Sequence, residues 1–133
     1  MKAFHIEIAT PDGLVYNGEV ESLLVRTDEG DIEILAGHAD LLATISTGRA
    51  RLLIDGKSRF ASACGGFLSV SGGKVRLCAI TFEFSDQIDI NRAKAAKERA
   101  EQLLKEAKDR RDEQIAKAKL LRAVSRINVA NMK

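Results

Sequence analysis

Glycine, proline and aromatic residues are missing from this 133-residue chain after Phe84. All ten glycines, the one proline and all six aromatic residues lie at or before that position, and the chain has no tryptophan. The remainder is rich in alanine, lysine, arginine and glutamate, which are strong helix formers. This change in composition predicts two domains, residues 1–84 and residues 85–133.

The chain also has few residues of the kinds that usually build catalytic or metal sites. Cys64 and Cys78 are the only cysteines and form no Cys-x-x-Cys pair, so we expect reduced thiols and no metal site. His5 and His38 are the only histidines, and neither a Ser/His/Asp arrangement nor a glycine-rich phosphate loop is present. No apolar run approaches the roughly 20 residues that cross a bilayer. We therefore expect a non-catalytic protein whose contact with any membrane runs through a partner.

Charge is divided unevenly between the two domains. Residues 1–84 carry eight basic and eleven acidic side chains, a net charge of −3, whereas residues 85–133 carry thirteen and eight, a net charge of +5. Acidic residues interleave the basic ones in the second domain, and no aromatic side chain there can stack on a base, so we expect no nucleic-acid partner. The alternative function is an adaptor whose basic helical arm binds a partner protein or nucleic acid.

The first domain alternates apolar and polar residues with the period of two that is typical of half-buried strands. Such segments occupy residues 2–10, 20–27, 30–35, 48–55, 58–64, 66–71 and 74–80, and glycine-containing breaks separate most of them. Gly72-Gly73 predicts a tight hairpin, because glycine readily adopts the positive φ of two-residue turns. Many short strands with no helix between them predict an antiparallel β-sandwich.

The second domain is predicted to be helical from Ile88 to about Ala130. Its thin apolar stripe falls into two segments, and the charged stretch KEAKDRRDEQ at residues 105–114 separates them. We expect a two-helix hairpin that turns near residues 109–112, although nothing in this stretch forbids one continuous helix. Because the stripe consists largely of alanine, packing favours either form only slightly, and both a permanent hairpin and a two-state element are compatible with it. The fold class is α+β, an antiparallel sandwich followed by a helical hairpin.

An antiparallel hairpin would bring several arginines together. Arg92 and Arg99 are seven residues apart on the first helix, and Arg122 and Arg126 are four apart on the second. Like charges converge unfavourably unless an anion lies among them, and guanidinium groups match phosphate oxygens, so a polyphosphate ligand is one interpretation. A solvated helix face is the other. Asp89 is placed either to cap the first helix or to accept a hydrogen bond from a base amine.

The sequence resembles the epsilon subunits of bacterial F-type rotary ATP synthases over essentially its whole length. The resemblance rests on TPDGLVYNGEVESLLV at residues 10–25, GHADLL at 37–42, GGFLSVSGGKVRLCA at 65–79 and IDINRAKAAKERA at 88–100. The chain departs from the family in the loop before residue 42, where Glu33, Ala36 and Asp40 replace the glycine and prolines that are often found there.

The resemblance implies a site for ATP as a regulatory ligand, with the involvement of magnesium left open. Nucleotide-binding members carry the pattern Ile/Leu-Asp-x-x-Arg-Ala, which is intact at residues 88–93. Ile115 stands where some tight binders have a basic residue. The implied nucleotide-binding residues are Glu83, Ile88, Asp89, Arg92, Ala93, Arg99, Arg122 and Arg126, and no metal site is implied.

The resemblance also implies a non-catalytic central-stalk subunit. Its sandwich would dock on the gamma subunit and the ring of c subunits, with Asp31 and His38 near that contact. Its helices would permit ATP hydrolysis when ATP holds them folded, and would inhibit it when they extend and engage the alpha and beta subunits. The expected location is peripheral, on the cytoplasmic side of the bacterial cell membrane, with membrane contact only through the complex.

Overall fold

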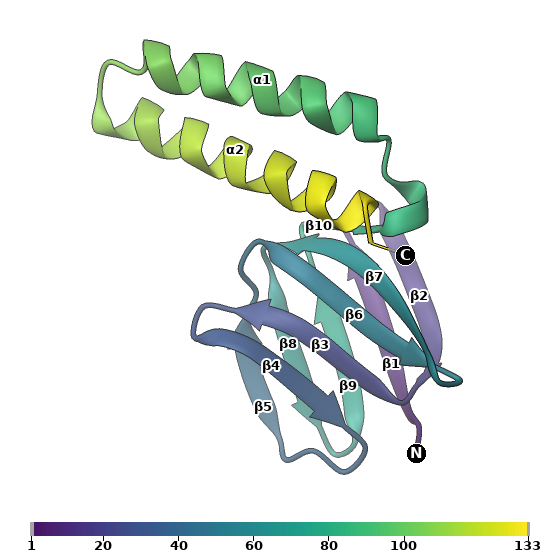
Figure 1. The fold of residues 1–133 in the computed structure, drawn as a ribbon. Coiled ribbons are helices and arrows are strands. Elements are labelled where there is room, and N and C mark those ends of the chain that lie inside the picture. The colour runs from purple at the N-terminus through teal and green to yellow at the C-terminus, as the bar shows by residue number, and fades with distance from the viewer. Residues whose placement is uncertain (1, 133) are drawn as a thin grey trace.

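A computed structural model describes residues 2–132 as two β-sheets followed by two helices (Figure 1). The expected α+β class, with a sandwich before a helical hairpin, is confirmed. The strands are β1 (Phe4–Thr10), β2 (Gly13–Val20), β3 (Ser22–Thr27), β4 (Gly30–Leu35), β5 (Leu41–Thr44), β6 (Gly48–Ile54), β7 (Lys57–Cys64), β8 (Phe67–Ser71), β9 (Lys74–Cys78) and β10 (Thr81–Phe84). A short 3₁₀ helix, η1 (Ser85–Gln87), leads into α1 (Ile90–Glu106) and α2 (Arg110–Ala130).

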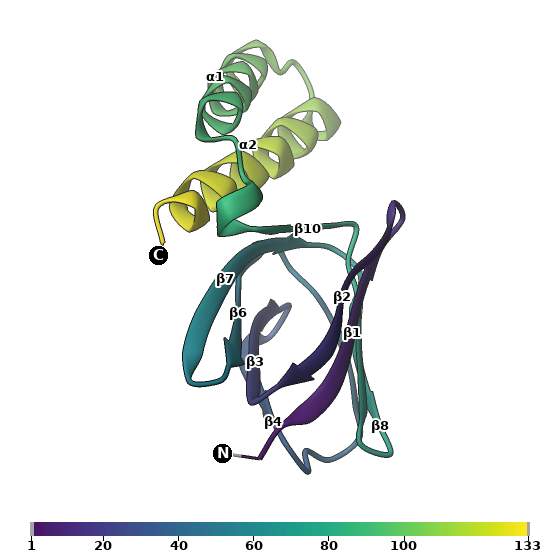
Figure 2. The ribbon, with the colours of Figure 1, turned by 90° about the vertical axis from the view of Figure 1, so that its right-hand side faces the viewer.

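Each sheet has five strands, in the orders β2-β1-β9-β8-β5 and β10-β7-β6-β3-β4. Turned by 90°, the ribbon shows the two sheets facing each other (Figure 2). The neighbouring strands pair antiparallel, as expected, except for β1 and β9. These two strands run parallel, with Ile6 beside Val75, which corrects the expectation of an entirely antiparallel sandwich. The first strand thus joins its sheet through a partner late in the chain, a long-range pairing that local alternation does not reveal.

Three strands that the sequence pattern did not indicate, β2, β5 and β10, are all edge strands. β2 and β5 bury little of their surface, so their alternation is weak, whereas β10 alternates but has only four residues. In β2, for example, only Val20 is buried. The predicted hairpin is confirmed, because β8 and β9 join through Gly72 and Gly73 at φ +56° and +80°, values that suit glycine.

The core lies entirely between the two sheets. Nineteen buried apolar residues form one cluster, and all of them fall between Phe4 and Phe84. Side chains such as Ile6, Leu23 and Leu77 are completely inaccessible to solvent. Burying one such side chain stabilises the fold by about 1.5–3 kcal/mol, so the sandwich has a substantial core of its own.

The helices instead bury small side chains. Apart from Val129, the buried residues of α1 and α2 are four alanines and one serine, Ala93, Ala100, Ala116, Ala123 and Ser125. The chain reverses at residues 107–109, slightly before the expected 109–112, because the Asp109 side chain accepts a hydrogen bond from the Asp112 amide and starts α2 there. The two helices pack antiparallel, as Figure 1 shows.

Only α2 packs extensively on the sandwich, where it contacts β6, β7 and η1. It lies between α1 and the sheets in both views (Figures 1 and 2). At the centre of this contact the hydroxyls of Ser62 on β7 and Ser125 on α2 form a buried hydrogen bond of 2.9 Å. The docking surface is therefore a small apolar and hydroxyl contact, much less extensive than the core of the sandwich.

We expect residues 1–84 to fold without the helices, because every member of the apolar core cluster lies within them. The fragment should show β-rich circular dichroism, dispersed amide resonances and a cooperative thermal transition. Residues 85–133 alone should show no cooperative transition, since they bury few large side chains. An unfolded 1–84 fragment would contradict the division into two domains.

Candidate functional site

A groove runs between the two helices and has a cavity volume of about 440 Å³. The size is typical of small-molecule sites. Its lining combines small apolar residues with four cationic side chains from both helices. The lining residues are Thr81, Ala96, Arg99, Ala100, Leu103, Lys119, Arg122, Ala123 and Arg126. We call this cavity the helix groove.

A smaller cavity of about 170 Å³ opens where α1 begins, and we call it the cap pocket. It is lined by Glu83, Gln87, Ile88, Asp89, Arg92, Ala93 and Arg126. Arg126 lines both cavities, so the two adjoin. All eight residues predicted to bind nucleotide line one or both of them, with Arg99 and Arg122 in the helix groove and the others in the cap pocket.

Alanine packing explains why the arginines converge. Ala93 and Ala100 are buried seven residues apart on α1, as Ala116 and Ala123 are on α2. Positions seven apart lie on nearly the same helix face, and a methyl group lets two helix backbones approach closely. Arg92, Arg99 and Arg122 each directly precede one of these alanines. Their long side chains therefore lie at the edge of the contact between the helices, where they line the cavities.

The cationic groups differ in their partners. Nε of Arg126 lies 2.6 Å from Oε1 of Glu83 on β10, and both side chains are about one-third exposed. Within residues 2–132, Arg92, Arg99 and Arg122 form no ion pair, and no carboxylate lines the helix groove. Unpaired cations around one cavity raise its positive potential, which favours a ligand with several negative charges.

Asp89 occupies the N-cap of α1. Its Oδ1 accepts hydrogen bonds of 3.1 Å from the amides of Asn91 and Arg92. The expectation of a cap is therefore confirmed. Among residues 2–132 its second oxygen, Oδ2, has no hydrogen-bond partner, and the side chain is exposed in the cap pocket. The same carboxylate can thus start the helix and accept a hydrogen bond from a ligand.

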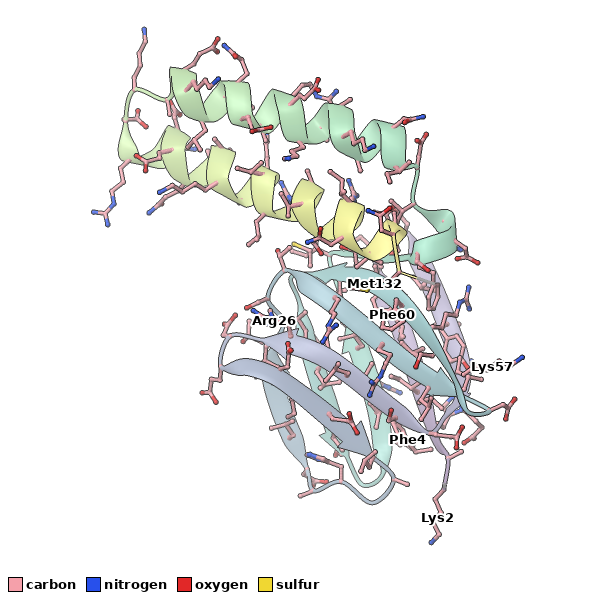
Figure 3. The ribbon with its side chains drawn as sticks, viewed as in Figure 1. Lys2, Phe4, Arg26, Lys57, Phe60 and Met132 are labelled. Carbon is pink, nitrogen blue, oxygen red and sulfur yellow. The ribbon has the colours of Figure 1, made fainter. Side chains whose placement is uncertain are left out.

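The two residues expected at a partner contact lie at opposite ends of β4. Asp31 follows the first residue of the strand and accepts a 3.1 Å hydrogen bond from Nε of Arg26. It lines a third cavity, of about 280 Å³, between the sandwich and α2, where Arg26 and Met132 mark the two sides in Figure 3. His38 follows the far end of the strand, with Nδ1 2.7 Å from the carbonyl of Ala39. A strand of this length spans roughly 17 Å, so the structure does not bring the two together.

Among the polar lining residues, sequence reasoning missed Lys119, Thr81 and Gln87. Lys119 precedes Arg122 by three positions and Arg126 by seven, so the helical period could have identified it. Thr81 and Gln87 carry no such signal, because packing of the hairpin on β10 and η1 places them there. Within residues 2–132 no group of three potential metal ligands occurs, and neither helix is long and apolar enough to span a membrane.

Two family models together match nearly the whole chain. The model described as ATP synthase, Delta/Epsilon chain, beta-sandwich domain matches residues 3–85, and the long alpha-helix domain of the same chain matches residues 86–131. ATP synthase epsilon chains of Bacillus pumilus and Bacillus velezensis are 40% and 42% identical over 130 residues, 98% of this chain and of each relative. The chain belongs to the family of ATP synthase epsilon chains. The expected family is thereby confirmed, and with it a non-catalytic subunit of the stalk.

Solved structures from the same kind of assembly share the fold. A chain in the Euglena gracilis mitochondrial ATP synthase structure, which comprises OSCP, F1 and c-ring, has a TM-score of 0.78 at 21% identity over 90% of this chain and 76% of that chain. A chain in the Tetrahymena thermophila central stalk and c-ring structure has a TM-score of 0.67 at 13% identity over 98% of both chains. The epsilon-chain architecture thus persists where little sequence identity remains.

Replacing the N-cap of this epsilon chain should destabilise its helices without any ligand. Asp89→Ala should cost about 1 kcal/mol of helix stability, because two amide hydrogen bonds are lost, whereas Asp89→Asn should cost much less. Thermal melting of the helical signal in far-ultraviolet circular dichroism measures the difference. Glu101→Ala, which removes an exposed acidic group from the middle of α1, is the matched control and should leave the midpoint nearly unchanged. Equal midpoints for Asp89→Ala and the control would contradict a stabilising cap.

Proposed function

We propose that this epsilon chain senses ATP, and that bound ATP stabilises the folded hairpin and so relieves inhibition of ATP hydrolysis. The observation that carries the proposal is the convergence of four arginines on two adjoining cavities, where Arg126 alone has a carboxylate partner within residues 2–132. A polyphosphate placed there replaces repulsion among cations with charge-assisted hydrogen bonds.

The two cavities differ in the part of a nucleotide that each suits. The cap pocket offers apolar surface from Ile88 and Ala93, and a carboxylate oxygen of Asp89 that can accept a hydrogen bond from the exocyclic amine of adenine. The helix groove offers Arg99 and Arg122 without any lining carboxylate. These features favour a nucleotide whose base lies in the cap pocket and whose phosphates lie in the groove.

ATP can act as a switch ligand only if it binds the folded form more tightly than the extended one. The lining of the cavities supports such a preference, because it comes from β10, α1 and α2 together. Extension of the helices would separate Glu83 from Arg126 and remove Arg99 from Arg122. A ligand at one hundred times its Kd stabilises the form it binds by about 2.7 kcal/mol, which is enough to shift a helical hairpin held by alanine packing.

The partners proposed for the two domains follow from their positions and charges. We assign the gamma subunit and the c-ring to the sandwich, whose β4–β5 loop with His38 lies at the end opposite the helices (Figure 1). Asp31, near the other end of β4, is exposed and lines the cavity between the sandwich and α2. The extended helices, with a net charge of +5, would engage acidic surfaces of the alpha and beta subunits. Through these contacts the protein would sit peripherally on the cytoplasmic side of the membrane and take part in ion-coupled ATP synthesis.

Replacing one arginine inside the site and another outside it should distinguish a specific contact with ATP from a general effect of positive charge. Arg92→Ala should weaken ATP binding to the isolated protein about tenfold, because one hydrogen-bonded charge contact contributes about 1.5 kcal/mol. Isothermal titration calorimetry with and without magnesium measures the affinity. Arg111→Ala removes an equally exposed guanidinium from the start of α2, outside both cavities, and should change the affinity little. Equal effects of the two variants, or no ATP binding by the unsubstituted protein, would contradict the site.

A disulfide across the docking surface should hold the hairpin folded. The side-chain oxygens of Ser62 and Ser125 are 2.9 Å apart, so Ser62→Cys with Ser125→Cys places two sulfurs within reach of a bond about 2.05 Å long. In the assembled enzyme, oxidation should raise the ATP hydrolysis rate toward that of an enzyme whose epsilon chain ends at residue 84, and reduction should restore inhibition.

Both the disulfide variant and its matched control carry Cys64→Ser and Cys78→Ser, and the control lacks only the introduced pair. It should respond to neither oxidant nor reductant, which excludes effects of the native thiols. Persistent inhibition in the oxidised, fully cross-linked enzyme would contradict the extended helices as the inhibitory form.

A further inference from the structure

A stripe of three cations follows α2 along the helix groove. Lys119, Arg122 and Arg126 are separated by three and four residues and all line the groove. The preceding position of the same stripe is Ile115, which is apolar and 45% exposed. On the facing helix, Arg99 is followed one turn later by Leu103. The cationic part of the groove therefore ends at Lys119.

The two ends of the cationic path are chemically different. At the Arg126 end, the cap pocket contains the carboxylates of Glu83 and Asp89, and the guanidinium of Arg126 is paired with Glu83. At the Lys119 end, within residues 2–132, no carboxylate lines the groove. A ligand with one neutral and one polyanionic end is therefore oriented with its negative charge increasing toward Lys119.

Lys119 differs from its neighbour Lys117 in a way that matters for binding. Nζ of Lys117 lies 2.8 Å from Oε1 of Glu113 in an i,i+4 ion pair, and Lys117 lines neither cavity. Lys119 is exposed, lines the groove and has no ion pair among residues 2–132. A lysine ammonium on a flexible stem is a mobile point charge, which suits a terminal phosphate that has three equivalent oxygens.

The helix geometry sets how far a ligand must extend to meet this group. Seven residues separate Arg126 from Lys119, which corresponds to about 10 Å along the helix axis. A monophosphate held at the cap pocket would remain near Arg126. Each added phosphate extends the ligand past Arg122 toward Lys119, so the third phosphate is the one that comes closest to the ammonium.

We propose that Lys119 binds the terminal phosphate of a nucleoside triphosphate and gives the helix groove a preference for triphosphates over diphosphates. The proposal rests on the proposed nucleotide site and adds a specificity-determining residue to it. In this arrangement the arginines and the cap pocket hold any adenine nucleotide, and Lys119 distinguishes its phosphate number.

The test measures ATP, ADP, AMP and inorganic tripolyphosphate binding to the full chain by calorimetry. Lys119→Ala should weaken ATP and tripolyphosphate about fivefold to tenfold, ADP less than twofold, and AMP not at all. Lys117→Ala is the matched control, because it removes the same charge two residues away and should affect all four ligands equally and slightly. Lys119→Arg should keep most of the ATP affinity. Circular dichroism should show unchanged helix content in each variant, since alanine and arginine both favour helix.

The outcomes separate this inference from the proposed function. If ATP binds and depends on Arg92, but Lys119→Ala behaves as Lys117→Ala does, the site stands and the role of Lys119 is overturned. Equal weakening of ATP and ADP by Lys119→Ala would also overturn it. If the unsubstituted protein binds neither ATP nor tripolyphosphate, both proposals fail. Retained Lys119-dependent binding of tripolyphosphate without ATP binding would support the phosphate position and reject the nucleotide assignment.

Discussion

The helical hairpin and the two cavities beside it depend on the alanine contact between the two helices. Ala93, Ala100, Ala116 and Ala123 are each at most 3% exposed, and they let the helices approach until longer side chains are forced to the rim. Burying four methyl groups contributes on the order of 3 kcal/mol, at about 0.8 kcal/mol per carbon. This is close to the stabilisation that a ligand gives at one hundred times its Kd. The same packing therefore creates a cationic groove and holds the hairpin only weakly, as the proposed control by a ligand requires.

The sandwich, unlike the helical hairpin, is held by a core of large side chains. This difference indicates that a conformational change can occur in the helices without unfolding the sandwich. Its core consists of large aliphatic and aromatic side chains that lie between two sheets. Docking of α2 buries Val129 and the hydroxyl pair of Ser62 and Ser125, and water can replace that hydrogen bond at a net cost of about 0.5–1.5 kcal/mol. Undocking of the helices thus leaves the sandwich intact. The sandwich can therefore stay folded while the helical hairpin changes position.

Local periodicity predicted the inner strands of the two sheets, but it missed three of the four edge strands, β2, β5 and β10. β1, β8 and β9 alternate buried and more exposed residues, whereas β2, with only Val20 buried, has little alternation to read. The parallel pairing of β1 with β9 is set by long-range contacts. At the site, seven-residue spacing predicted the convergence of arginines, but thirteen basic residues in the second domain hid Lys119 among them. Asp31 lines the cavity beneath α2, and no local pattern predicts this position because docking of the helix determines it.

The ion pair of Glu83 and Arg126 connects the cavities with the surface where α2 docks on the sandwich. Glu83 belongs to the sandwich and Arg126 to α2, so this pair crosses the contact that extension would break, and it also lines the cap pocket. In the proposed site, phosphate in the helix groove would compete with Glu83 for Arg126, which lines that groove as well. A pair that is one-third exposed contributes about 1 kcal/mol at most, so weakening it costs less than contacts to several unpaired arginines return. The net effect proposed for the anion is to favour the folded hairpin, and by reciprocity the folded hairpin would raise the affinity for the anion.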